Sequence, residues 1–200
     1  MNEEHPTYPM TVYGGSKLAG ECYTRAFYRS YGFPAVIIRP FNTFGPNCHH
    51  EGDSGEVIPK MILRALAGKP MVIFGNGEQT RDFTYVGDTA RGIILAGTKD
   101  AAIGETINIG SGKEITINTL TERIRTILEM PNAQLIHDDP RPGDTLRLFA
   151  DIRKAKELID FTPEVSFDSA LIELRDWYLK QDKSPEELLE NERIHNWEAQ

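Results

Sequence analysis

The chain has 200 residues and a net charge of -8 at pH 7, and 40% of its residues are hydrophobic. This composition is typical of a folded globular protein and argues against disorder and against a nucleic-acid partner. No apolar run is long enough to cross a bilayer, residues 1–5 do not resemble a signal peptide, and two cysteines give no disulfide framework. We therefore expect a cytoplasmic protein with no membrane partner.

Hydrophobic periodicity predicts alternating helices and strands. A proline-broken loop over residues 1–9 precedes a long amphipathic helix over 11–31. The short apolar run 35–40 is typical of a parallel strand that is covered on both faces, and it leads into a loop over 42–56. The pattern further predicts helices over 57–66, 88–98, 118–130, 152–159 and 170–181, and extended segments over 71–74, 81–86, 105–109 and 133–137.

This order predicts an α/β protein in which the early residues complete a parallel sheet and the later residues form a smaller mixed lobe. The boundary falls near residues 42–54. The polar stretch 184–200 is expected to be a surface helix or tail that buries little. The strand at 35–40 needs neighbouring strands, and few residues before it can supply them.

A possible catalytic pair lies near the start of the first helix. Tyr13 and Lys17 are four residues apart, so they share one helix face with Cβ atoms about 5–6 Å apart. A nearby ammonium favours the phenolate, which would let the tyrosine accept or deliver a proton near neutral pH. Such pairs also occur on solvated helix faces, so the spacing alone leaves both interpretations open.

Six motifs in order carry a resemblance that runs from residue 1 to about residue 181: HPTYPMTVYGGSKLAGE, RPFNTFGP, VIPK, FGNGEQTRDFTYVGD, INIGSG and RPGD. Together they resemble the extended short-chain dehydrogenase/reductases that act on nucleotide sugars, the NAD-dependent epimerase/dehydratase family. The resemblance implies the C-terminal part of a Rossmann-type, doubly wound parallel sheet plus a smaller mixed α/β substrate-binding lobe. Residues 1–42 would end the NAD-binding domain, 43–181 would form mainly the substrate-binding lobe with some segments returning to the sheet, and 182–200 would be a C-terminal helix or tail.

Family members open with a βαβ unit whose glycine-rich loop holds the dinucleotide pyrophosphate, and they carry a catalytic Ser or Thr upstream of the tyrosine. Neither feature precedes Tyr13 in this sequence. We therefore expect the C-terminal part of a longer enzyme, inactive alone, with apolar surface exposed along the helix at 11–31 and the strand at 35–40.

The resemblance assigns cofactor and catalytic roles to three residues. Tyr13 resembles the acid/base that removes the proton of the sugar hydroxyl. Lys17 resembles the residue that favours ionisation of that tyrosine and hydrogen-bonds the nicotinamide ribose. Pro40, at the end of the predicted strand, would lie on the nicotinamide side of the cofactor.

Substrate roles follow in the same way. Asn42 resembles a residue that reaches the substrate diphosphate, although a loop-capping side chain would look the same, and strand ends are where such sheets bind ligands. The segment with Val72 and Phe74 resembles one whose backbone meets the nucleotide base. A buried edge strand would give the same pattern.

Two arginines and one aspartate complete the predicted substrate site. Arg81 and Arg141 resemble diphosphate ligands, because guanidinium groups offer the planar, bidentate donors that adjacent phosphates need. Asp144 resembles a carboxylate that binds the ribose hydroxyls. The alternative for both arginines is an exposed ion pair, with Asp82 and Asp144 as partners.

Four other features of the sequence do not point to a catalytic or cofactor site. The loop that holds His49, His50 and Asp53 lacks the spacing of metal ligands, so we predict no metal. The resemblance implies that this loop lies beside the substrate and shapes sugar selectivity. The turn at 110–112 does not make a phosphate loop. Cys22 is expected to pack against neighbours. The aromatic residues at 23, 27, 28 and 31 are expected in a core or in a helix–helix contact, and the resemblance implies that this helix joins a dimer interface.

The resemblance thus implies an NAD-dependent nucleotide-sugar 4-epimerase with a nucleoside diphosphate sugar as substrate and a homodimeric full-length form. The alternatives are a nucleotide-sugar 4,6-dehydratase and a non-catalytic, truncated nucleotide-sugar-binding module. Residues that would separate the two enzymes lie upstream of the catalytic tyrosine in this family.

Overall fold

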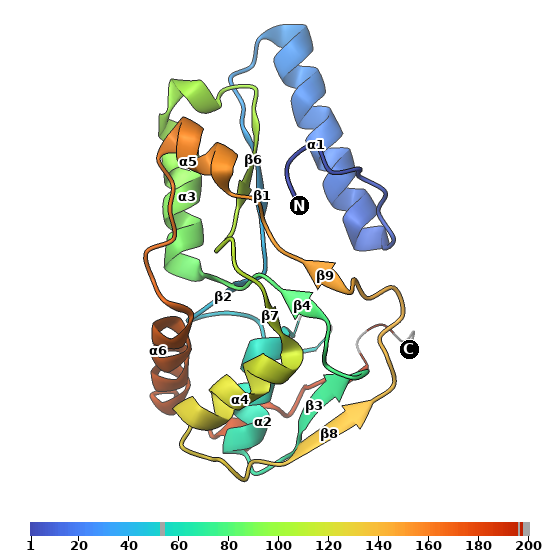
Figure 1. Cartoon of the computed structure of the whole chain (residues 1–200), viewed down its shortest axis with the longest axis vertical. Helices are drawn as coiled ribbons and strands as arrows, with labels where there is room; N and C mark the ends of the chain where they lie inside the picture. Colours follow the sequence, from blue (N-terminus) through green and yellow to red (C-terminus); the bar gives the residue numbers. More distant parts are fainter. Residues whose placement is uncertain (53–54, 196, 198–200) are drawn as a thin grey trace. The chain divides into compact units, whose positions relative to one another are not determined.

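A computed structural model describes residues 1–52, 55–195 and 197. The chain forms two compact units, and each unit is assembled from three separate segments (Figure 1). Unit 1 contains Met1–Thr43, Thr80–Glu114 and Pro142–Glu164, and unit 2 contains Phe44–Gln79, Ile115–Arg141 and Val165–Gln200. The division of roles near residue 42 stays a prediction, because compactness does not show what a unit binds.

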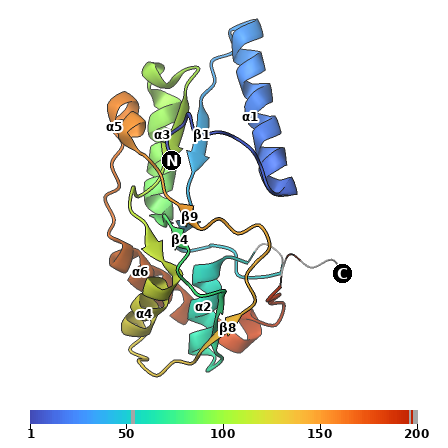
Figure 2. The ribbon, with the colours of Figure 1, turned by 45° about the vertical axis from the view of Figure 1, so that its right-hand side comes forward.

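Unit 1 is built around a pair of parallel strands. Strand β1 (Ile37–Pro40) pairs with β6 (Thr106–Ile109), and Ile37 lies opposite Thr106. Helices α3 (Val86–Thr98) and α5 (Arg153–Ile159) lie on one side of this pair, and α1 (Val12–Tyr31) lies on the other (Figure 2). The shorter elements are β4 (Thr80–Arg81), β5 (Thr84–Tyr85), η1 (Asp100–Ala102) and β9 (Arg147–Leu148), while β2 (Thr43–Phe44) spans the junction of the units.

The apolar core of unit 1 forms where α3 and α5 meet β6. Gly92 of α3 permits this close approach, because a Cβ there would lie 2.9 Å from Ile109 and 3.1 Å from Phe161. All four residues of β6 are buried, whereas β1 is only half-buried. The apolar run at 35–40 does form a parallel strand, and it is left partly open, in agreement with the apolar surface expected along it in this chain. Strand β6 is the covered one, because its Ile107 and Ile109 belong to the buried core cluster, whereas Ile38 of β1 is only partly buried.

Polar contacts rather than a core attach α1 to the strands. Glu21 accepts hydrogen bonds from Arg39 Nε at 2.9 Å and Nη2 at 2.5 Å, and it also pairs with Arg25 at 2.5 Å. No residue of α1 is buried, which confirms the expected exposure of apolar surface on this helix. Cys22 is exposed, so the expectation that it packs is wrong. The aromatic side chains of α1 are not core residues either: Tyr23, Phe27, Tyr28 and Tyr31 are 36–77% exposed.

The Glu21 contacts predict a pH dependence of stability. The hydrogen bond from Arg39 lowers the pKa of Glu21 below its ordinary value of 4.5. The folded state therefore binds the proton less well than the unfolded state, so this contribution is present above pH 4.5 and is lost as the pH falls through the lowered pKa. We expect the difference in unfolding free energy between wild type and Glu21→Gln, measured by urea denaturation, to shrink over that range.

Glu122→Gln is the matched control, since Glu122 pairs with Arg125 one helical turn away and its own side chain is 66% exposed. Such pairs contribute little, so this variant should follow wild type at every pH. A wild-type advantage over Glu21→Gln that persists unchanged in acid would contradict the assignment.

Unit 2 surrounds a second parallel pair, β3 (Met71–Phe74) and β8 (Leu135–Asp138). Helices α2 (Val57–Leu66) and α4 (Ile117–Ile127) pack against β3, and α6 (Phe167–Leu179) packs against both helices. The remaining elements are β7 (Ile115–Thr116) and α7 (Pro185–Leu188). The core is aliphatic, and its fully buried side chains include Ile58, Met61, Ile62, Leu63, Met71, Ile73, Leu120 and Ile124.

The structure confirms every predicted helix and shifts some ends. Helix α6 begins at Phe167 rather than residue 170, because the Ser166 side chain accepts a hydrogen bond from the Ser169 amide and caps the helix. The extended segment at 81–86 is two short strands. Leu189 is only 4% exposed, so the stretch after residue 184 buries more than expected. No helix in the described residues has the length and apolarity to cross a membrane.

Candidate active site

The predicted catalytic pair lies on the first turns of α1 in unit 1. The Thr11 side chain accepts a hydrogen bond from the Gly14 amide at 3.0 Å and fixes the start of the helix. Lys17 Nζ lies 5.2 Å from the centroid of the Tyr13 ring, so the ammonium and the phenol are neighbours. Tyr13 is 71% exposed, which leaves its hydroxyl accessible to a ligand.

Pro40 and Asn42 follow the carboxyl end of β1. Asn42 is anchored through its backbone, because its carbonyl oxygen accepts a hydrogen bond from the Thr84 amide at 2.9 Å. Its side chain is exposed, and no hydrogen bond to it occurs in the described residues. The loop-capping alternative thus has no supporting contact in this part of the chain, while the role in diphosphate binding stays a prediction.

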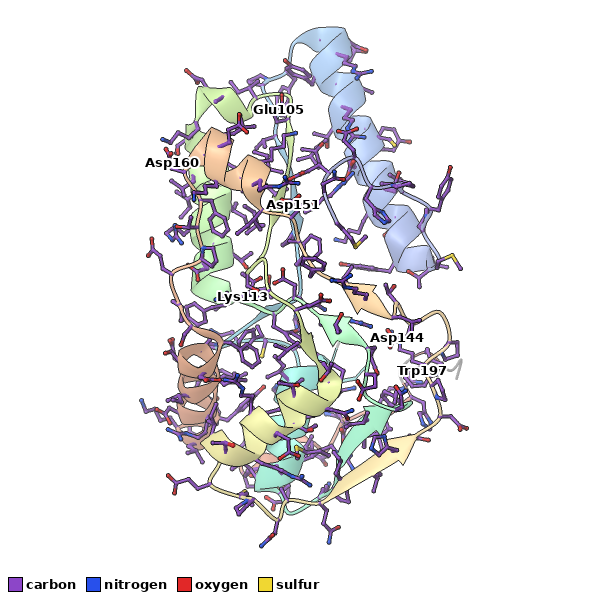
Figure 3. The ribbon with its side chains drawn as sticks, in the orientation of Figure 1. Glu105, Lys113, Asp144, Asp151, Asp160 and Trp197 are labelled. Atoms are coloured by element: carbon purple, nitrogen blue, oxygen red, sulfur yellow. The ribbon has the colours of Figure 1, made fainter. Side chains whose placement is uncertain are left out.

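Arg81 and Asp144 meet in unit 1. Arg81 Nη2 donates to Asp144 Oδ1, and Nη1 donates to the carbonyl oxygens of Thr80 and Thr145, both at 2.7 Å. Asp144 lies on the loop before β9 (Figure 3). These contacts use three of the five guanidinium hydrogens, and the Nε hydrogen and the second hydrogen of Nη2 have no partner in the described residues. Arg81 is therefore held in place with two donors unused.

Asp82 is a structural residue that the sequence did not single out. Its carboxylate is fully buried and accepts hydrogen bonds from the amides of Ser111, Gly112 and Ala150 at 2.8–3.0 Å. The Ser111 hydroxyl donates a further bond at 2.6 Å. Of the two partners named in the ion-pair alternative, Arg81 pairs with Asp144 and not with Asp82, and the pair is largely buried rather than exposed. The turn at 110–112 thus serves as a partner for this carboxylate.

Three predicted substrate residues line one pocket in unit 2. Val72 and Phe74 of β3 and Arg141 border a pocket of about 110 Å³, together with residues of α2 and of the C-terminal segment. Arg141 is exposed, and its guanidinium Cζ lies 5.4 Å from the centroid of the Trp197 ring. The pocket therefore combines an apolar strand surface, a cation and an aromatic face.

The C-terminal segment, residues 189–195 and 197, contributes to this pocket, which the sequence did not predict. Trp197, labelled in Figure 3, packs edge-on against Phe74 with ring centroids 4.8 Å apart. His195 Nε2 lies 2.8 Å from Asp138 Oδ2 at the end of β8, and this contact lowers the pKa of Asp138. A tryptophan in an otherwise polar stretch was the available signal, because large aromatic side chains tend to be buried.

Loop 45–56 approaches the same pocket at Gly55. A Cβ there would lie 2.8 Å from the His50 carbonyl oxygen, so the backbone of the loop leaves no room for a side chain at this position. Lys60 Nζ donates to the Arg193 carbonyl oxygen at 2.7 Å.

The same loop holds Cys48 and His50 against Tyr178 of α6. Burial raises the pKa of the Cys48 thiol and of the Tyr178 hydroxyl, which disfavours a thiolate nucleophile there. Asp53 lies outside the described residues. Within those described, no group of three or more His, Cys, Asp or Glu side chains could hold a metal.

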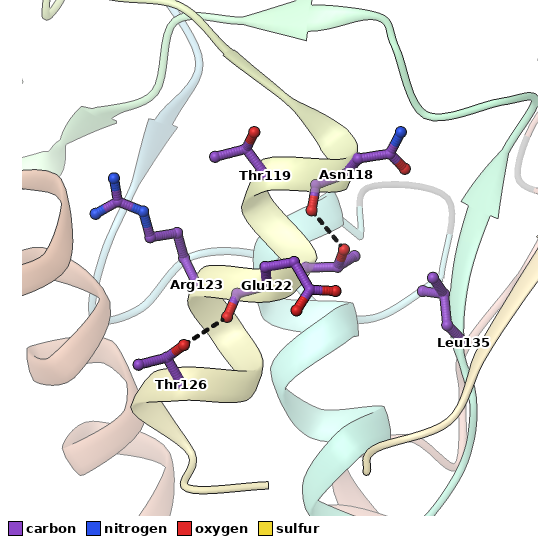
Figure 4. A pocket seen from close by; sticks show the side chains of 7 residues that line it. Asn118, Thr119, Glu122, Arg123, Thr126 and Leu135 are labelled. Atoms are coloured by element: carbon purple, nitrogen blue, oxygen red, sulfur yellow. Dashed lines mark hydrogen bonds between the residues drawn. The ribbon is translucent and has the colours of Figure 1, made fainter. Parts of the chain in front are cut away.

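A separate depression lies over α4 (Figure 4). Its lining includes Asn118, Glu122 and Thr126, and none of the predicted site residues. The Thr126 hydroxyl donates to the Glu122 carbonyl oxygen at 2.9 Å, so it is used within the helix. This depression is therefore not part of the site predicted from the sequence.

Comparisons with known proteins agree with the motifs. The model of the NAD dependent epimerase/dehydratase family matches residues 1–110. A putative UDP-glucose 4-epimerase from Methanocaldococcus jannaschii is 36% identical over 177 residues, which is 88% of this chain and 56% of that protein. The dTDP-glucose 4,6-dehydratase of Haemophilus influenzae is 33% identical over 188 residues, 88% of this chain and 54% of the relative.

A solved structure gives the same result. UDP-glucuronic acid 4-epimerase from Bacillus cereus, in complex with UDP-glucuronic acid and NAD, is similar with a TM-score of 0.82 and 32% identity. The similarity covers 88% of this chain and 55% of that one. The chain thus spans about half the length of the curated relatives it matches.

Proposed function

The chain belongs to the NAD dependent epimerase/dehydratase family, and from this premise we propose that it carries the proton-transfer and substrate-binding residues of a nucleotide-sugar 4-epimerase. The observation that carries the proposal is the Tyr13–Lys17 pair, with the ammonium 5.2 Å from the phenol ring centroid on an accessible helix face. A phenol that exchanges protons beside a fixed cation is suited to the oxidation of a sugar hydroxyl.

The residues present fit one end of NAD. Lys17 offers ammonium hydrogens to the nicotinamide ribose, and Pro40 lies at the end of β1, where parallel sheets bind ligands. When bound, NAD supplies reversible hydride acceptance. The chain's own residues handle the proton: Tyr13 Oη, ionised beside the Lys17 ammonium, takes the proton of the C4 hydroxyl, holds it as the neutral phenol and returns it when the hydroxyl re-forms.

The substrate would be a nucleoside diphosphate sugar. Within unit 2 we assign base contact to the strand surface at Val72 and Phe74 and phosphate contact to Arg141. Within unit 1 we assign phosphate contact to Asn42 and Arg81 and ribose contact to Asp144. The two unused N–H donors of Arg81 support its assignment, since phosphate oxygens accept from such donors. A homodimeric form and a cytoplasmic location stay predictions.

A 4,6-dehydratase is the second proposal, favoured by the similarity to dTDP-glucose 4,6-dehydratases. Both reactions begin with the same oxidation at C4. Incubation of the protein from the complete reading frame around this sequence with NAD and UDP- or dTDP-glucose, followed by chromatography, separates them. An epimerase yields the C4 epimer, a dehydratase yields the 4-keto-6-deoxy sugar, and binding without either product would indicate a non-catalytic module.

The arginine assignment predicts a specific loss of affinity. Arg81→Lys should weaken UDP or dTDP binding by roughly 10-fold or more, because a point charge cannot keep the Asp144 contact and still offer two parallel donors. Calorimetry on the variant measures this change, and urea denaturation should show a smaller effect on stability.

Arg123→Lys is the control for this prediction, since Arg123 and Asp168 form a pair in which both side chains are 49% exposed. It should leave both measurements unchanged. Unchanged affinity in Arg81→Lys would instead place Arg81 in the scaffold of unit 1.

A further inference from the structure

The C-terminal segment is fastened to unit 2 by contacts that are independent of one another. Arg64 Nη1 lies 2.8 Å from Glu192 Oε2, and both side chains are only 9% exposed. The Gly52 amide donates to the Asn191 carbonyl oxygen at 2.9 Å. With the Lys60 and His195 contacts described above, these bonds hold the segment at the pocket over its whole length. The C-terminal segment is therefore held in place by other residues of unit 2.

Trp197 is clamped between two groups of this pocket. Phe74 meets it edge-on at 82°, and the Arg141 guanidinium lies over its ring. A guanidinium that lies over an aromatic face keeps its N–H donors directed outward in its own plane. In the described residues no carboxylate or carbonyl oxygen accepts from Arg141, so these donors are available to a ligand.

We propose that Trp197 is a positioning residue for Arg141: the indole holds the guanidinium so that its free donors meet the phosphates of a nucleoside diphosphate. This inference rests on the proposed function, because it assumes that Arg141 binds the diphosphate. A flexible, exposed arginine loses side-chain entropy when it binds a ligand, and a preformed stack removes part of that cost. Trp197 itself needs no contact with the phosphates.

The alternative is that Trp197 occupies the place of the base. An indole against Phe74 and under Arg141 would then compete with the nucleotide, and its removal would strengthen binding. The two possibilities differ in the sign of the effect and in which part of the ligand is affected.

The test is calorimetric titration of the whole chain with UDP and dTDP, and with uridine and thymidine as phosphate-free counterparts. Trp197→Ala should weaken binding of the diphosphates by roughly 3- to 30-fold, the range that a cation–π contact supports. Binding of the nucleosides should not change, because Arg141 would touch only phosphate. Trp197→Phe keeps an aromatic face and should restore most of the diphosphate affinity.

Fluorescence gives a second readout. In a Trp177→Phe background Trp197 is the only tryptophan, since the chain has two. Trp177 packs against Tyr178 with ring centroids 4.9 Å apart, so phenylalanine keeps a ring at that place. The emission of Trp197 should change on diphosphate binding, and Arg141→Ala should abolish that change.

Each outcome decides a different claim. Tighter diphosphate binding in Trp197→Ala, or equal losses for diphosphates and nucleosides, would overturn the positioning role. Normal diphosphate binding in Trp197→Ala combined with weak binding in Arg141→Ala would overturn this inference and leave the proposed function intact. Wild-type chain with no affinity for any diphosphate would count against the proposed substrate site itself.

Discussion

Tyr13→Phe should lower turnover by about 10²–10⁴-fold in the protein made from the complete reading frame around this sequence. The variant removes only the hydroxyl oxygen that exchanges the proton with the sugar, so nucleotide-sugar affinity should stay nearly the same. Stability should also stay the same, because Tyr13 is 71% exposed and its hydroxyl makes no hydrogen bond in the described residues. Steady-state rates, calorimetry and urea denaturation measure the three quantities.

Tyr23→Phe is the matched control, since Tyr23 lies on the same helix and is 70% exposed. It should keep wild-type turnover. If Tyr13→Phe retains most of its activity while Tyr23→Phe is normal, Tyr13 has no part in proton transfer.

Asp82→Ala should destabilise unit 1 by roughly 3–5 kcal/mol of unfolding free energy. The variant leaves three backbone amides at residues 111, 112 and 150 without an acceptor, and the site is closed to water because Asp82 is fully buried. The unfolding free energy of Asp82→Asn should lie between those of wild type and Asp82→Ala, since the amide keeps one acceptor oxygen but places a donor against the remaining N–H groups. Urea denaturation measures the series.

Asp168→Ala serves as the comparison, because Asp168 forms an exposed pair with Arg123. Its loss should cost no more than about 1 kcal/mol. Equal effects of the two alanine variants would show that the buried carboxylate does not organise the turn at 110–112.

The regular elements could be predicted because their signals are local. The helix at 11–31 has apolar residues at helical spacing and a glycine stop, and the structure ends α1 at Tyr31 before Gly32 in the left-handed region at φ 65°. The burial of β1 could not be predicted in this way. It depends on which side chains from distant segments pack on the strand, and an apolar run has the same pattern in a fully covered strand and in a half-covered one.

In the candidate site, too, contacts within one helix could be predicted and contacts between distant residues could not. The Tyr13–Lys17 neighbourhood follows from helix periodicity alone. The contacts of Asp82 reach residues 111, 112 and 150. The contact of Arg141 with Trp197 joins residues 56 positions apart. No local sequence pattern predicts either of them. Buried carboxylates and cation–π contacts of this kind depend on tertiary structure, which only the folded chain provides.

The interleaving of the two units has a consequence for synthesis on the ribosome. A nascent chain that has reached Arg141 still lacks Pro142–Glu164 of unit 1 and Val165–Gln200 of unit 2. The missing parts include α5 and Phe161, which complete the core around β6, and α6, which packs on α2 and α4. Neither unit can complete its core before residues after Arg141 have been synthesised. This differs from proteins whose domains fold one after another as they emerge from the ribosome. Both cores stay incomplete until the residues after Arg141 have been synthesised, which is when we expect chaperones to engage this chain.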